Sequence, residues 1–88
     1  MTEQELLQKV KQMTNYTSDY HNEFLSGWID EAKCRLADSG VSDSAINSKC
    51  SVGVIALIVT DIVDNGGVFS EMTNNRIAQL ALTYPRGV

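Results

Sequence analysis

Histidine and cysteine are scarce in this chain of 88 residues, which holds one histidine and two cysteines. His21 has no second histidine and no neighbouring cysteine, so the sequence offers neither a zinc-site pattern nor a Ser-His-Asp arrangement. Cys34 and Cys50 are too few for a disulfide framework and do not match a metal-binding pattern. We therefore expect both thiols to be reduced and buried, where a thiol behaves as a small apolar group.

Basic residues are also in the minority, because 7 Lys and Arg stand against 11 Asp and Glu, a net charge of -4. Proteins that grip DNA neutralise phosphates with clustered Lys and Arg, and here the basic residues are scattered. The longest strongly apolar run, residues 52–59, falls far short of the roughly 20 residues of a membrane-spanning helix. The polar start, residues 1–5, is unlike a signal peptide, so we expect a cytoplasmic protein without a membrane segment.

Apolar residues recur at helical spacing and predict four helices. These span about residues 3–13, 19–38, 44–64 and, after a cap at Ser70 or Thr73, a last segment that ends near residue 83. Thr2 and Glu5 match a capping box at the first helix, and Gly40 supplies the left-handed residue that ends the second. Pro85 prevents continuation of the last helix, so residues 84–88 should form a short extended tail.

The second helix carries one apolar stripe. Its members step by three and four and are Tyr20, Phe24, Leu25, Trp28, Ile29, Ala32 and Leu36. The aromatic residues would also suit base stacking, but their core spacing and the shortage of basic neighbours favour packing. Gly27 interrupts this helix at a cost of roughly 1 kcal/mol relative to Ala, and a glycine there would permit the close approach of another helix.

The third helix is the most apolar element. Ile46, Cys50, Val54, Ile58 and Ile62 lie four apart on one face, and further apolar residues cover much of the rest. A helix that is apolar on most sides is a central one. The β-branched run within it would also suit a buried strand, but no second strand-like run exists to pair with it. We therefore predict one all-α domain, a small bundle of about four helices with two long central helices.

Carboxylates are plentiful but spread along the chain, and no pair of them is placed for general acid–base chemistry. Asp61 differs, because it interrupts the apolar helix one turn before Asp64, and it marks either the exposed edge of that helix or a contact with a partner. Residues 64–67 are too short for a calcium loop, and Gly66-Gly67 does not match a phosphate-binding loop. We predict a turn there, and no catalytic residue, metal or cofactor, so the chain should not be an enzyme.

The order of these elements resembles a known family. A first helix with Leu6-Leu7 and Val10 is followed by a polar turn and by a long helix containing YHNEFLSGWIDEA, residues 20–32. The apolar segment 43–64 then ends near an Asn-Gly turn, and RIAQL, residues 76–80, closes the chain. This order is similar to the small head–tail connector (adaptor) proteins of tailed bacteriophages and their prophage copies.

The resemblance implies a structural virion protein. Such proteins self-associate into a ring, usually a dodecamer, between the portal protein and the stopper or tail-completion proteins. The ring extends the DNA channel, and the DNA passes through it without specific binding. The expected location is the cytoplasm of the bacterial host during virion assembly and DNA packaging, and then the head–tail junction of the virion.

Within that reading, the turn near residues 64–70 and the tail from residue 84 are expected to be exposed and adaptable enough to dock neighbouring rings. The candidate partner contacts are Asp61, Asp64, Asn65, Gly66, Gly67, Phe69, Tyr84 and Arg86. The alternative is a small helical regulator or adaptor that binds a partner helix in a groove, as a dimer. The size of the protein in solution separates a ring from a dimer.

Overall fold

The computed structural model describes residues 2–14 and 22–87. Its elements are α1 (Glu3–Thr14), α2 (Asn22–Asp38), α3 (Asp43–Ile46), the 3₁₀ turn η2 (Lys49–Ser51), α4 (Val52–Asp64) and α5 (Glu71–Thr83). Within these ranges extended pairing is limited to one isolated antiparallel bridge between Val41 and Pro85. The predicted all-α class is confirmed.

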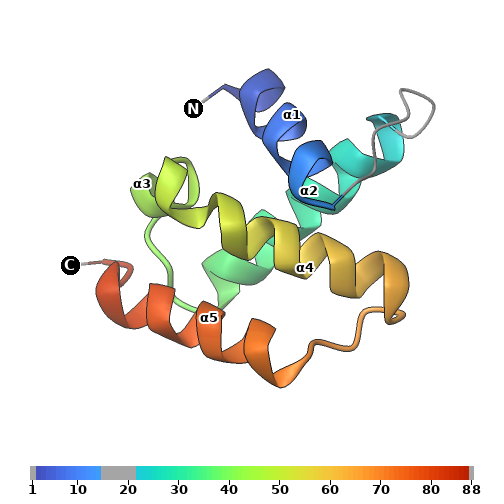
Figure 1. Cartoon of the computed structure of the whole chain (residues 1–88). Coiled ribbons are helices and arrows are strands. Elements are labelled where there is room, and N and C mark those ends of the chain that lie inside the picture. Colours follow the sequence, from blue (N-terminus) through green and yellow to red (C-terminus); the bar gives the residue numbers. More distant parts are fainter. Residues whose placement is uncertain (1, 15–21, 88) are drawn as a thin grey trace.

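Helix α4 occupies the centre of the domain (Figure 1). It crosses in front of α2, with α1 above it and α5 below it in this view. Helix α4 packs against all three of these helices. Its fully buried Ile55, Ile58 and Val59 belong to the same core cluster as Leu25 and Leu36 of α2. The central position predicted for the apolar helix therefore holds for its second part, α4.

The first part of the predicted helix 44–64 is wrong, because the chain breaks between α3 and α4. The hydroxyl of Ser48 donates to the carbonyl of Ala45 at 2.8 Å. The buried hydroxyl of Ser51 donates to the carbonyl of Ile46 at 2.7 Å. Short polar side chains that bond nearby backbone groups compete with the helix in this way, so a continuous long helix is replaced by two segments.

Both cysteines are exposed, so their predicted burial is wrong. Cys50 lies in η2, which winds more tightly than an α-helix, and the four-residue spacing no longer places it on the face of Ile46 and Val54. Cys34 follows the buried Ala32 by two residues, which brings it to the other side of α2. Periodicity alone could not separate these positions from true core positions.

The inner face of α2 is buried as predicted, and its members are Leu25, Ile29, Ala32 and Leu36. Phe24, predicted for the same stripe, is 62% exposed, and Trp28 is half-buried. Tyr20, His21 and the predicted start of this helix at residue 19 lie outside the described residues. A Cβ on Gly27 would meet no atom within 4 Å, so the expected close approach of a helix is not made inside the described chain.

Helix α1 begins with half of the predicted capping box, because the carboxylate of Glu5 accepts from the hydroxyl of Thr2 and not from its amide. The Oγ1 atom of Thr2 accepts from the amide of Glu5 at 3.1 Å and donates to its Oε1 at 3.1 Å. The spacing in residues 3–13 predicts an inner face of Leu6, Leu7, Val10 and Met13, with Lys11 outside, but Lys11 is buried and Met13 is 56% exposed. The buried face of α1 is thus rotated toward Lys11 and away from Met13.

The ends of α2 and α5 follow the predicted caps. Gly40 has φ +94°, and the amide of Val41 donates to the carbonyl of Leu36 at 3.1 Å, which is the bond of a Schellman motif. At the start of α5, the hydroxyl of Ser70 accepts from the amide of Thr73 at 3.2 Å. Of the two caps considered for the last helix, Ser70 is the one used.

Candidate interaction surfaces

Asp61, near the end of α4, organises the turn between α4 and α5. Its Oδ2 accepts from the amide of Ser70 at 3.0 Å, and its Oδ1 accepts from the side-chain amide of Asn65 at 2.9 Å. Its carbonyl also accepts from the amides of Asn65 and Gly67, at 3.0 and 3.1 Å. Because Asp61 is buried, the interpretation that it marks the exposed edge of the helix is wrong. Its carboxylate is engaged inside the chain and ties the start of α5 to the end of α4.

The environment of Asp61 favours the ionised carboxylate. Burial raises the pKa of its carboxyl, but hydrogen bonds from Thr73, Ser70 and Asn65 act against it, and the pKa ends below the ordinary 3.8. The N-terminus of α5 lies beside this carboxylate, and the unpaired amides of a helix N-terminus carry partial positive charge. The folded state therefore binds the charged form of Asp61 preferentially.

The surface of this turn is exposed, as expected for its four predicted contact residues Asp64, Asn65, Gly66 and Gly67. The positive φ angles of Gly66 and Gly67, 62° and 87°, confirm the predicted turn. Phe69, the other predicted residue in this segment, is half-buried. The structure thus gathers the predicted residues 61–69 on one edge of the domain, and their contact with a partner stays a prediction.

The predicted C-terminal tail is hydrogen-bonded through its backbone to the loop between α2 and α3. The carbonyl of Tyr84 accepts from the amide of Ser42 at 2.9 Å, and the amide of Arg86 donates to the carbonyl of Gly40 at 2.7 Å. The Nη1 atom of Arg86 also donates to the carbonyl of Ala37, at 3.4 Å. Tyr84 and Arg86 are exposed, but the backbone of the tail closes the fold rather than being adaptable. Deleting the tail would therefore disturb the domain as well as any docking.

The hydrogen-bonded tail brings Tyr84 to Cys50, with 3.5 Å between the phenolic oxygen and the sulfur. Hydrogen bonds from Tyr84 and Ser48 lower the pKa of the Cys50 thiol below its ordinary 9.0, and the contact raises the pKa of Tyr84 above its ordinary 10.0. An exposed thiol with a lowered pKa reacts faster near neutral pH. Sequence reasoning missed this pair because only the break before α4 turns Cys50 outward.

A further surface that the sequence did not indicate lies along the outer side of α4. Two adjoining hollows there, of about 260 and 250 Å³, share Met13 and Gly53. Their lining residues are Lys9, Gln12, Met13, Lys49, Val52, Gly53, Ala56, Leu57, Thr60, Met72 and Arg76. We call this surface the α4 groove. Among these described lining residues three are basic and none is acidic, although the whole chain is acidic.

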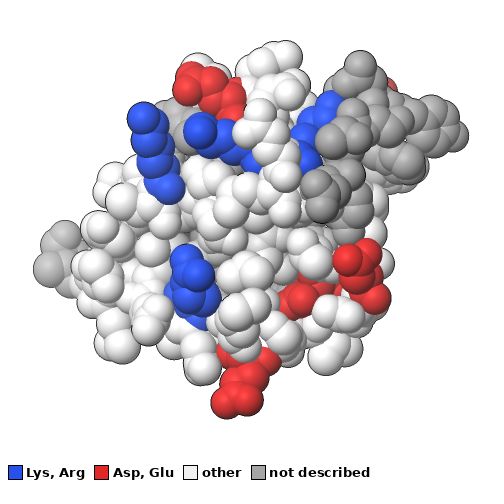
Figure 2. Space-filling model, in the orientation of Figure 1, with Lys and Arg blue, Asp and Glu red and all other residues white. Residues whose placement is uncertain are grey.

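Six of the eleven residues that line the α4 groove are apolar or glycine. Gly53, Leu57 and Thr60 are spaced by four and three residues and lie on one side of α4. Met13 of α1 and Met72 of α5 line the groove on either side of them. The two methionines are 56% and 58% exposed. Figure 2 shows a broad uncharged surface over α4 and α5, with Lys and Arg toward its upper and left parts and Asp and Glu at the top, the right and the bottom of the view. Flexible methionine side chains suit a surface that adapts to a partner.

A second apolar surface runs along one flank of α2 to the α4–α5 turn. We call it the aromatic strip, and its residues are Phe24, Trp28, Arg35 and Phe69. The rings of Phe24 and Trp28 are stacked, with centroids 6.1 Å apart and planes at 29°. The guanidinium carbon of Arg35 lies 5.5 Å from the centroid of the Phe69 ring, a cation–π distance. Large side chains that pack on each other at the surface form a stiff, apolar contact area.

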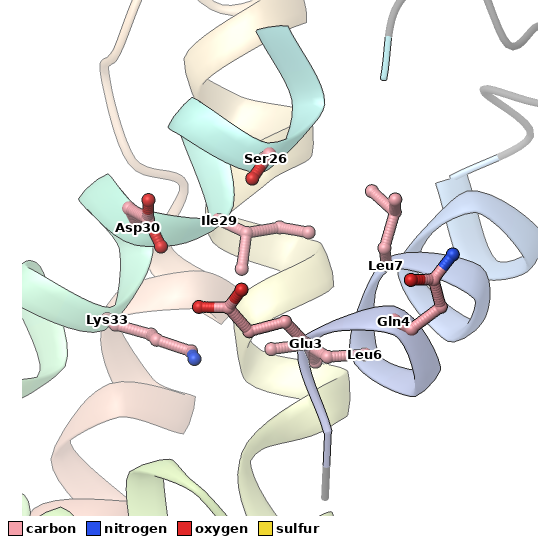
Figure 3. Close-up of a pocket in the computed structure, with 8 residues that line it drawn as sticks. All are labelled: Glu3, Gln4, Leu6, Leu7, Ser26, Ile29, Asp30 and Lys33. Atoms are coloured by element: carbon pink, nitrogen blue, oxygen red, sulfur yellow. The ribbon is translucent and has the colours of Figure 1, made fainter. Parts of the chain in front are cut away.

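The small cavity between α1 and α2 is less suited to a partner. Figure 3 shows Asp30 and Lys33 on the α2 side and Gln4 and Leu7 on the α1 side, with the carboxylate of Glu3 reaching between them. Its volume is about 140 Å³. Sites for drug-sized ligands measure about 300–1,000 Å³, so this cavity has room only for a much smaller molecule.

No group of three or more His, Cys, Asp or Glu in residues 2–14 and 22–87 is arranged to hold a metal ion. None of the helices described is both long and apolar enough to cross a membrane. Comparison with protein-family models, with curated proteins and with solved structures finds no match.

Proposed function

We propose that the chain is a structural subunit of a head–tail connector ring, in a phage or a prophage. The observation that carries the proposal is the presence of two different apolar surfaces, the α4 groove and the aromatic strip, on one small helical domain. A ring subunit needs this arrangement, because each copy contacts one neighbour through one patch and the other neighbour through a different patch. The resemblance in the order of the helices supplies the kind of ring.

In this role the ring lies between the portal protein and the stopper or tail-completion protein. The exposed residues of the α4–α5 turn and of the tail, Asp64 and Tyr84 among them, are the proposed contacts to these proteins. The net charge of -4 supports a channel that lets DNA slide, since an acidic wall repels phosphate weakly and does not bind it. The protein would assemble in the bacterial cytoplasm and end at the head–tail junction.

Electron microscopy of the purified protein mixed with the portal protein encoded near it tests this proposal. The expected result is an additional ring of density stacked on the portal. A portal that carries no added density across a range of protein concentrations would refute the connector role.

The alternative function is a dimeric helical regulator that receives the helix of a partner protein. The observation in its favour is the α4 groove, whose exposed Met13 and Met72 resemble the adaptable lining of helix-binding surfaces. The mass of the purified protein in solution distinguishes the regulator from the connector. A stable dimer that binds no portal favours the regulator, and a higher closed assembly favours the connector.

A further inference from the structure

The two apolar surfaces face in different directions. The inner side of α2, including Leu25 and Ile29, packs toward α4 in the core, so the flank with Phe24 is turned away from α4. The α4 groove opens on the side of α4 that carries Gly53 and Leu57. In Figure 1, α2 lies behind α4 and the two helices cross. One copy therefore cannot fill its own groove with its own strip.

We propose that the aromatic strip of one copy docks in the α4 groove of a second copy. The acids beside the strip complement the basic residues of the groove, whereas the strip's own cation, Arg35, lies over the ring of Phe69. The groove is lined by Lys9, Lys49 and Arg76, and Nη2 of Arg76 lies 3.7 Å from the position that a Cβ on Gly53 would take. Beside the strip, Glu23 and Glu31 are exposed. Opposite charges around an apolar contact steer association and select one register.

The glycine of α2 adds a second argument for close contact with another molecule. Glycine destabilises a helix interior relative to alanine. A Cβ on Gly27 meets nothing within 4 Å, so no neighbour in the described chain requires a glycine at this exposed position. Gly27 lies next to the strip, between Phe24 and Trp28. A backbone without a side chain lets the second copy approach α2 closely there.

The total surface of the chain leaves room for two such contacts. A standard stable interface covers about 800 Å² per partner, which is roughly a seventh of the 5400 Å² surface of this chain. The strip and the groove have no residue in common. Because strip and groove face in different directions, a copy that docks its strip leaves its own groove open to a further copy, so the contact can repeat head-to-tail, as a ring requires. That the repeated contact closes into a ring rests on the proposed function. The contact between one pair of copies rests only on the two surfaces.

The test uses one variant in each surface. Phe24→Ser disables the strip, and Met72→Glu puts an acid into the groove; both positions are more than half exposed, so both variants should fold normally by circular dichroism. Sedimentation velocity at low salt, up to millimolar protein, measures association. Wild type should form species larger than a dimer, and each variant alone should associate at least about tenfold more weakly, as expected when a central aromatic contact is lost.

Mixing the two variants gives the decisive result. The strip of Met72→Glu can still enter the groove of Phe24→Ser, and no other pairing remains, so the mixture should form a 1:1 dimer that does not grow. Leu82→Ser is the matched control, because Leu82 is 83% exposed and lies outside both surfaces, and it should associate as wild type does. A wild-type monomer at millimolar concentration, variants that associate normally, or a mixture that stays monomeric would each overturn the inference.

A portal-binding assay with wild type and Phe24→Ser shows separately whether the docking interface or the proposed function fails. If Phe24→Ser still forms rings on the portal as wild type does, the docking interface is wrong and the connector role stands. If the mixture forms its 1:1 dimer but wild type adds no ring to the portal, the interface stands and the connector role fails.

Discussion

Replacing Asp61 by asparagine should destabilise the domain, and the size of the effect follows from its hydrogen bonds. The carboxylate of Asp61 accepts from the amide of Ser70 at 3.0 Å and from the side chain of Asn65 at 2.9 Å. A hydrogen bond to a charged group contributes about 1.5–3 kcal/mol, and the new amide oxygen can still accept one bond. We expect Asp61→Asn to lower the free energy of unfolding by about 2 kcal/mol. That is a large part of the roughly 4–13 kcal/mol expected for a chain of 88 residues.

The pH dependence of this loss has a definite sign. The folded state lowers the pKa of Asp61 below 3.8, which means that folding favours its charged form. Its contribution is therefore complete above the ordinary pKa and is lost as the pH falls through the lowered pKa of the folded state. The difference in stability between wild type and Asp61→Asn should be constant near neutral pH and should shrink below about pH 4.

Urea unfolding followed by circular dichroism at several pH values measures both effects. Glu71→Gln is the matched control, because Glu71 is an exposed acid in the first turn of α5 and its removal costs only the helix-dipole contribution, about 0.3–1 kcal/mol. The reasoning is refuted if Asp61→Asn is no less stable than Glu71→Gln at neutral pH. It is equally refuted if the difference from wild type persists unchanged in acid.

Three further predictions concern other parts of the molecule. Gly27→Ala should raise the free energy of unfolding by up to about 1 kcal/mol, because the new Cβ meets nothing within 4 Å, and a lower melting temperature would contradict this. Removing residues 84–88 should lower the free energy of unfolding by about 1–3 kcal/mol, since the two backbone hydrogen bonds between the tail and the loop that joins α2 to α3 are lost. Hydrogen exchange at the Ser42 amide should quicken, and unchanged protection of that amide would contradict the role of the tail in closing the fold. Tyr84→Phe should slow alkylation of Cys50 below pH 9.0, because the phenol of Tyr84 lowers the pKa of the thiol. The rate is measured in a background that lacks Cys34, so that only Cys50 reacts. Equal alkylation rates with and without the phenol would contradict the contact between Tyr84 and Cys50.

Local chemistry in the sequence predicted the helix ends well. The N-cap Thr2, the left-handed Gly40 and the Ser70 cap all have their expected roles. Each depends on residues no more than five positions apart, so tertiary packing has little power to override them. The turn at residues 64–67 follows for the same reason, because adjacent glycines at positive φ suit no regular element.

Periodicity was a weaker guide to which side chains are buried. Phe24 and Leu25 both belong to the predicted stripe, but Leu25 is 1% exposed and Phe24 is 62% exposed. The stripe of a helix is wider than the contact it makes, and only the position of the neighbouring helix decides which part is covered. The same limit applies to α1, where burial of Lys11 and exposure of Met13 reverse the prediction.

The sequence by itself determined that this chain is helical, where most of its helices end, and that α4 lies at the centre, because these properties depend on spacing, caps and total hydrophobicity. Tertiary structure alone decided the surfaces. It buried Asp61 against the start of α5, turned Cys50 toward Tyr84 and left the α4 groove open. These features join segments far apart in the chain, and no local pattern specifies how two helices rotate against each other. The apolar helix that dominates the sequence is therefore only partly a core element, since its outer side is the surface that we propose another copy covers.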